Sequence, residues 1–159
     1  MKDGTMKMRL KNQKGTSVVE FAIVLPLLVL LLFGIIEFSL LLFNKQVITN
    51  ASREGARAGI VAQVPRVSDP AIRKVVSDYA KAHLVTFGSD TLVEDADHIP
   101  IVREDVNTDN PPNSFGDDLK VTVNYQYDFL VFPGIIVGLF SGNMGQTLPL
   151  RAVTVMRLE

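Results

Sequence analysis

A long apolar stretch near the N-terminus limits what this chain can fold into. Every residue from Phe21 to Ile36 is apolar, Gly or Pro, and after Glu37 a largely apolar sequence continues to Phe43. A helix needs about 20 such residues to cross the hydrocarbon core of a bilayer. The sequence therefore predicts one transmembrane helix over about 21–43. The rest of a 159-residue chain suits a single further domain.

Charges differ on the two sides of this helix. Residues 1–15 contain five basic residues and one acidic residue, whereas the whole chain has a net charge of −1. Basic flanks remain in the cytoplasm by the positive-inside rule. We therefore expect a cytoplasmic N-terminus and an acidic body outside. A body of this charge does not favour nucleic acid as a partner.

Three kinds of N-terminal signal combine a basic flank with an apolar stretch. A cleaved secretory signal has an apolar part of about 7–15 residues, and the stretch here is too long for that class. An uncleaved signal anchor explains the charge and the length, but not why Glu20 stands at the basic edge of the stretch. A prepilin-type signal, in which a short basic leader ends in Gly and the apolar helix follows the cut, explains all of these features.

The candidate processing site is the bond between Gly15 and Thr16, so residues 1–15 would be the leader. Gly has no side chain to obstruct the close approach of a membrane peptidase. A cut here leaves Glu20 as the fifth residue, followed by Phe21. A carboxylate near the bilayer is costly unless it is paired, and the freed amino group of a neighbouring subunit can pair with Glu20. The alternative is that Glu20 extends toward the lipid headgroups.

The helical pattern continues beyond the membrane. Small and apolar residues recur at helical spacing between Val47 and Gly59, and Pro65 ends the pattern. We therefore expect one helix over residues 16–63. Its second half would form the spine of an extracytoplasmic head over residues 64–159.

Three charged residues, Arg53, Glu54 and Arg57, fall on the expected spine. Arg53 and Arg57 are four residues apart and therefore share one side of the helix. The simpler interpretation is a solvated polar face. The alternative is a docking patch for an acidic partner.

The head combines a helical pattern with strand patterns. A second helix is expected from Asp69, a suitable N-cap residue followed by Pro70, to about Gly88. The fold class that follows is α+β. A long N-terminal transmembrane and spine helix packs against a small C-terminal antiparallel sheet, with one or two further helices.

Strands are expected over residues 99–102, 119–127 and 149–157. Apolar residues alternate cleanly on one face of 119–127. The last segment is less cleanly amphipathic, which favours a central position in the sheet. Residues 129–140 are apolar but too few for a second span. They form either a buried crossover between two strands or a surface against lipid or a partner subunit.

No catalytic arrangement is recognisable in the sequence. The chain has no Cys, which excludes disulfides, zinc–thiolate sites and a Cys nucleophile. Its two histidines, His83 and His98, stand apart, and the acidic segment 94–98 is most simply a solvated loop. The segment 105–116 begins like a calcium loop but lacks the Gly at its sixth position and the Glu at its twelfth. We therefore expect neither an enzyme nor a bound metal or cofactor.

Three stretches in the first half of the chain resemble the TadE-like family of pseudopilins. They begin with Gly15-Thr-Ser-Val-Val-Glu20, Gly34-Ile-Ile-Glu37 and Asn50-Ala-Ser-Arg-Glu54. More loosely, residues 121–125 and 150–159 are similar to the C-terminal part of the family.

The resemblance implies a structural role. TadE-like proteins are minor pilin-like components of the bacterial Tad (tight adherence) secretion system, which builds Flp-type pili for adhesion. It also implies cleavage by a prepilin peptidase after Gly15 and an assembly role for Glu20. The implied partners are other Tad pilins and pseudopilins, the inner-membrane assembly platform and membrane lipid. Phe21 stands where major Flp pilins carry Tyr, and this chain is larger than they are, which favours a minor pseudopilin.

Glu37 is a second carboxylate on the same helix. It lies roughly 7–8 Å along the helix from the middle of the expected span. A short side chain does not reach water from that depth, so it should face another helix or be protonated. Our hypothesis is that Glu37 pairs with a polar or basic group of a partner in the assembly.

Two functions follow from these observations. The first is a minor pseudopilin, a single-pass protein of the bacterial inner membrane that is processed after Gly15. The alternative is an unprocessed, signal-anchored extracytoplasmic protein that binds or senses a ligand. For the first function, the final location is open between the pilus, the platform beneath it and the periplasm.

Overall fold

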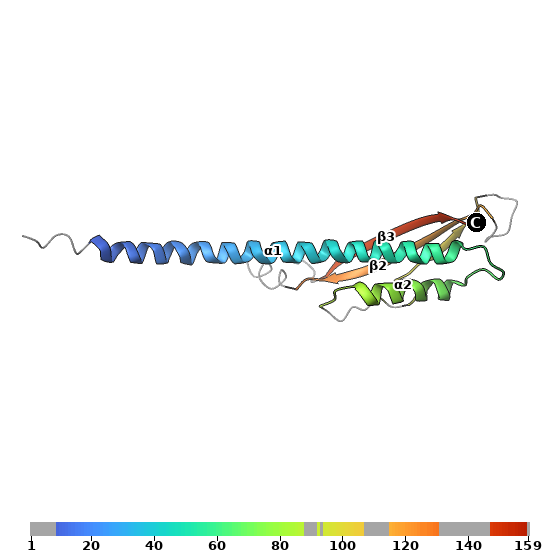
Figure 1. The fold of residues 1–159 in the computed structure, drawn as a ribbon, viewed down its shortest axis with the longest axis horizontal. Coiled ribbons are helices and arrows are strands. Elements are labelled where there is room, and N and C mark those ends of the chain that lie inside the picture. Colours follow the sequence, from blue (N-terminus) through green and yellow to red (C-terminus); the bar gives the residue numbers. More distant parts are fainter. Residues whose placement is uncertain (1–8, 88–91, 93, 107–114, 131–146, 159) are drawn as a thin grey trace, which may run out of the picture.

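The computed structural model describes residues 9–87, 92, 94–106, 115–130 and 147–158. One long helix, α1, carries a head beside its C-terminal half (Figure 1). The head consists of a second helix, α2, and a three-stranded antiparallel sheet in the order β1-β2-β3. This arrangement confirms the predicted α+β class.

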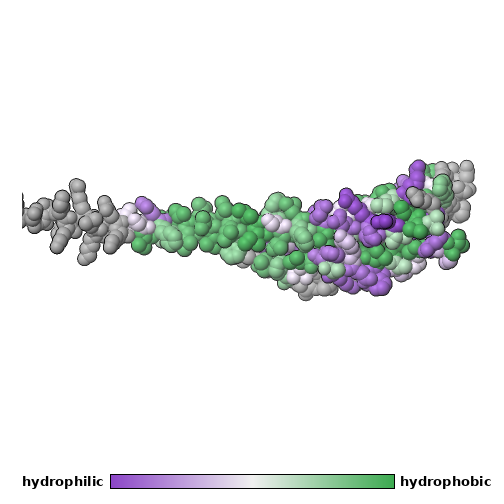
Figure 2. Space-filling view, in the orientation of Figure 1, coloured by the Kyte–Doolittle hydropathy of each residue, from purple (hydrophilic) through white to green (hydrophobic). Residues whose placement is uncertain are grey.

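Helix α1 spans Arg9–Ile60, which is 52 residues or about 78 Å. We predicted a helix over 16–63, so α1 begins earlier and ends slightly sooner, and Pro26 lies inside it. Side chains from Gly15 to Leu32 are all exposed. Figure 2 shows their hydrophobic surface as a continuous band that leads into the more polar head. Among the described residues, α1 is the one helix long and apolar enough to cross a membrane.

Helix α2 spans Asp69–His83 and buries one apolar side against α1. We had expected Asp69 to be the N-cap residue, but the N-cap is Ser68. The Asp69 carboxylate instead accepts a hydrogen bond from Arg103 on β1, and the same guanidinium donates to the Val67 carbonyl at 3.1 Å. The helix ends before Gly88, the predicted terminator, which lies outside the described residues.

The sheet contains β1 (Ile101–Glu104), β2 (Asp118–Asp128) and β3 (Thr147–Arg157). Strand β2 is central, so the expectation that the last strand would be central was wrong. The exposed face of β3 carries two valines, Val153 and Val155. They weaken the alternation of apolar and polar residues, and the sequence therefore suggested burial on both faces. An edge strand also tolerates Pro149, because Pro cannot donate a hydrogen bond to a neighbouring strand.

The core lies between the two helices and one face of the sheet. As predicted, one face of β2 is apolar, and it is buried through Leu119, Val121, Val123, Tyr125 and Tyr127. Small residues on α1 allow this close packing.

Two glycines of α1 show how tight the packing is. A Cβ atom at Gly55 would collide with Val76 of α2, and one at Gly59 would collide with Leu119 and lie 2.8 Å from Ile72. The small-residue stripe seen in the sequence is therefore the contact line of α1 with α2 and β2.

Two of the sequence expectations concern segments outside the described residues. Residues 131–146 include most of the apolar segment 129–140, for which we weighed a crossover against a lipid-facing or partner-facing surface. Residues 107–114 include most of the calcium-like segment. Both interpretations stay predictions.

Candidate functional site

The proposed processing bond lies within α1, near its N-terminal end. Gly15 and Thr16 are helical and exposed. A Cβ atom placed on Gly15 would meet no other atom within 4 Å. Gly stabilises a helix less than Ala does, by about 1 kcal/mol, so Gly15 lowers the cost of unwinding the helix locally. The bond is therefore open to solvent, and no neighbouring side chain stands over Gly15.

Glu20 and Phe21 follow one helical turn after Thr16. Both side chains are exposed. Within the part of the chain that the structure describes, Glu20 accepts no hydrogen bond and forms no ion pair. It therefore stands at the edge of an apolar surface with its carboxylate available to another molecule.

Glu37 has a different environment, because it is 3% exposed. The hydroxyl of Tyr127 donates to its Oε1 atom at 2.8 Å. The backbone N–H of Leu130 donates to the same carboxylate at 3.0 and 3.1 Å. We name this group, Glu37 with Tyr127 and the backbone of Leu130, the Glu37 cluster. These donors belong to the same chain, and the pairing of Glu37 with a partner in the assembly stays a prediction.

Tyr127 sits near the end of the central strand, where β2 reaches α1. Its ring packs edge-on against Phe129, with 5.5 Å between the ring centroids. Burial, and then the hydrogen bond to Glu37, raise the pKa of Tyr127 above its ordinary value. The phenol is therefore a stable donor at neutral pH. The alternation of β2 predicted a buried Tyr127, but nothing in the sequence linked it to a residue 90 positions earlier.

Asn44 is a second buried polar residue on α1, and the sequence did not indicate its role. Its side-chain amide donates to the Val85 carbonyl at 2.6 Å and accepts from the Val85 N–H at 3.0 Å. It thereby joins α1 to the segment after α2. Asn44 stands between Phe43 and Lys45 at the end of the apolar stretch, and this local sequence gave no sign of its pairing with Val85.

The possible docking patch, Arg53, Glu54 and Arg57, lies on the exposed side of α1, away from the head. Within the described ranges, these three side chains form no hydrogen bond or ion pair. This placement agrees with both earlier interpretations, a solvated face and a docking patch. The docking patch stays a prediction.

The two histidines lie in different parts of the head. His83 stacks on Tyr79 at the end of α2. The ring of His98 contacts Asp95 through its Nδ1 atom at 2.8 Å, and the His98 N–H donates to the same carboxylate oxygen at 2.7 Å. These bonds, led by the backbone one, lower the pKa of Asp95 below its ordinary value. In the described ranges no three His, Cys, Asp or Glu residues are placed to hold a metal ion.

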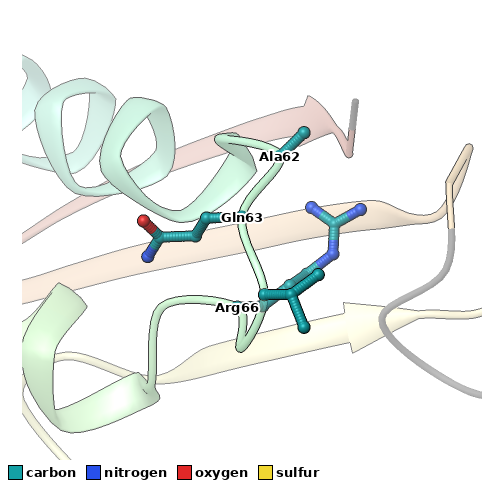
Figure 3. Close-up of a pocket in the computed structure, with 4 residues that line it drawn as sticks. Ala62, Gln63 and Arg66 are labelled. Atoms are coloured by element: carbon teal, nitrogen blue, oxygen red, sulfur yellow. The ribbon is translucent and has the colours of Figure 1, made fainter.

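One hollow of about 490 Å³ lies at the loop after α1. It is lined by Ala62, Gln63, Val64 and Arg66. In Figure 3 the labelled side chains of Ala62, Gln63 and Arg66 point in different directions rather than toward a common centre. The Arg66 guanidinium lies 3.5 Å from the carbonyl of Ile60, at the end of α1. Among the described residues, this lining lacks the convergent polar groups that are typical of a small-molecule site.

Comparison with known proteins gives one match. Residues 15–57 match the model of a family described as TadE-like protein. No curated protein and no solved structure matches the chain. The matched segment contains the proposed processing bond, Glu20, Glu37 and the possible docking patch. The resemblance to the TadE-like family that the sequence motifs indicated is therefore confirmed over residues 15–57.

Proposed function

We propose that the protein is a minor pseudopilin that takes part in the assembly of Flp-type (tight adherence) pili after a prepilin peptidase cuts it behind Gly15. The match to the TadE-like family supports a function associated with the Tad pilus. One observation carries the finer proposal: Glu20 and Glu37, the two carboxylates in the apolar part of α1, have different environments. Glu37 is buried and bonded within the chain, whereas Glu20 is exposed and, among the described residues, unbonded.

The position of Glu20 suits pairing between subunits. A carboxylate at the edge of the bilayer is stabilised by a nearby cation. After the cut, the amino group of Thr16 is such a cation. Along the helix axis it lies one turn, roughly 6 Å, before the Glu20 of the same chain. A neighbouring copy or another pilin that is shifted along the axis by this distance brings its amino group level with Glu20.

The exposed apolar half of α1 supports membrane anchoring before assembly. Side chains from Val18 to Leu32 are all exposed, and their surface is apolar except at Glu20. In our proposal, the basic leader lies in the cytoplasm and the head lies outside the bacterial inner membrane. The partners are the prepilin peptidase, other Tad pilins or pseudopilins and the assembly platform.

Processing is tested by the mass of the N-terminus in cells with and without the prepilin peptidase. We expect the native chain to lose residues 1–15 only when the peptidase is present. The substitution Gly15→Leu should prevent the loss, because a bulky side chain replaces the open space at the cut. Its effect on folding should be small, since a Cβ atom at Gly15 meets nothing within 4 Å.

Gly4→Leu is the matched control, because it places the same side chain in the leader but away from the bond. This variant should be processed like the native chain. If the native N-terminus keeps its full mass in the presence of the peptidase, the pseudopilin proposal fails. The unprocessed signal-anchored binding or sensor protein is then the better interpretation.

A further inference from the structure

The apolar surface of α1 and the head overlap along the helix. On the side that faces the head, Glu37 is the first buried residue among the described side chains of α1. On the opposite side, large apolar side chains continue for another two turns. Phe38 is 62% exposed, Leu42 is 51% exposed and Phe43 is 49% exposed. The first exposed polar side chain after them on α1 is Gln46. Residues 38–43 therefore have the head on one side and an uncovered apolar surface on the other.

We propose that lipid acyl chains cover this surface, so that the membrane-proximal end of the head, at the Glu37 cluster, lies within the outer part of the bilayer. The inference rests on the proposed membrane anchoring but not on processing or on the pilus. It concerns the depth at which the chain sits.

Helix length is the first argument. Glu20, an exposed carboxylate, marks one edge of the span. The 16 residues from Phe21 to Ile36 measure about 24 Å, whereas the 23 residues from Phe21 to Phe43 measure about 34 Å. The hydrocarbon core is about 30 Å thick. A span that ended where the head begins would be too short, and one that ends at Phe43 fits with a modest tilt.

Polar groups in the overlap region give the second argument. Hydrocarbon offers no hydrogen bonds, so polar groups at that depth need partners within the protein. The Glu37 carboxylate has Tyr127 and the Leu130 N–H. The Ser39 hydroxyl, which lies on the exposed side, donates to the Ile35 carbonyl at 2.7 Å, as is common for Ser in membrane helices. Both polar side chains of the segment 37–43 therefore have partners within the chain.

The head supplies apolar surface at the same level. Leu130, whose backbone belongs to the Glu37 cluster, is 48% exposed. Beyond Phe43 the helix becomes polar, and the Lys45 ammonium bonds the Arg151 carbonyl of β3. Lys side chains near the end of a membrane helix keep their charge out of the hydrocarbon, so Lys45, two residues after Phe43, suits the boundary between hydrocarbon and headgroups. The surface is therefore continuous with the lipid-facing surface of α1 and ends in interfacial residues.

The chain has no Cys, so single labels can be placed without background. Leu31, Leu42 and Arg53 are spaced by 11 residues, close to three helical turns, and so lie on one side of α1. All three side chains are exposed. We would attach a nitroxide to Leu31→Cys, Leu42→Cys and Arg53→Cys in the full chain, in vesicles of phosphatidylethanolamine and phosphatidylglycerol. Spin relaxation then measures collisions with oxygen, which dissolves in lipid, and with a water-soluble nickel chelate.

We expect the oxygen-to-nickel collision ratio at position 42 to be close to that at 31 and several-fold above that at 53. A ratio at 42 like that at 53 would show a water-exposed surface and overturn the proposal. Shielding from both reagents, with spectral broadening between labels, would show that a second copy covers the surface, which also overturns it. Nickel access at position 31 would mean that the membrane anchoring itself is wrong.

A second measurement tests the same depth without a nitroxide, whose attachment can disturb local packing. The chain has no Trp, so Leu42→Trp gives a single tryptophan emission. Lipids brominated on their acyl chains should quench this emission strongly, and Arg53→Trp should be quenched much less. Equal, weak quenching of both variants would contradict the proposed depth.

Discussion

A carboxylate in an apolar helix is costly unless donors surround it. At the residue scale, Glu37 meets this condition. Its donors are Tyr127 on β2 and the N–H of Leu130, which follows that strand. Glu20, seventeen positions earlier on the same helix, does not meet it among the described residues. Glu37 therefore helps to hold the head together, whereas Glu20 is available to other molecules.

The Glu37 cluster should stabilise the head measurably. Glu37→Leu leaves the Tyr127 hydroxyl and the Leu130 N–H without their acceptor, which should cost about 1–3 kcal/mol per unsatisfied group. Glu37→Gln keeps one oxygen at the position that accepts both bonds and should cost less. The thermal unfolding midpoint of the full chain in detergent, followed by circular dichroism, measures the difference. Glu54→Gln is the exposed control, and an unchanged midpoint in Glu37→Leu would refute a stabilising role.

Asp95 should make the head sensitive to acid. Hydrogen bonds, first from the His98 backbone, lower its pKa in the folded state below the value of 3.8 for a free side chain. Its contribution is therefore complete above about pH 3.8 and is lost as the pH falls through the lower folded value. Asp95→Asn should lower stability at neutral pH and lose less on acidification. Asp97→Asn, an exposed neighbour, should behave like the native chain in the same pH series of thermal unfolding.

At the scale of elements, glycines of α1 pack against large apolar side chains of α2. Gly55→Ala should destabilise the head by about 1–3 kcal/mol, because the added methyl group collides with Val76. That cost exceeds the gain of about 1 kcal/mol in helix propensity. Combining Gly55→Ala with Val76→Ala should restore part of the loss relative to Val76→Ala alone, as measured by thermal unfolding.

Gly15→Ala is the control for this experiment, because it adds the same methyl group where no atom lies within 4 Å. It should leave the unfolding of the head unchanged. If Gly55→Ala proves as stable as Gly15→Ala, then α2 does not rest on α1 at Gly55.

At the scale of the whole molecule, periodic features were predictable and pairings between distant residues were not. The apolar length of α1, the alternation of β2 and the start of the second helix near Asp69 are local patterns, and each appears in the structure. The donors to Glu37 lie 90 and 93 residues away, so no local pattern reveals them. The prediction of strand order failed for a similar reason. Which strand is central depends on how the helices and the other strands pack around it, and no local pattern shows this.

One consequence of the long helix is mechanical. From Gly15 to Ile60, α1 is a single rod, and the described part of the head packs against its second half. Pro26 cannot donate the amide hydrogen that would bond the preceding turn, so bending stiffness is lowest there. A sideways load on the N-terminal end therefore flexes the rod at Pro26, eleven residues before the Glu37 cluster. A pull along the axis, in contrast, passes undiminished to the head.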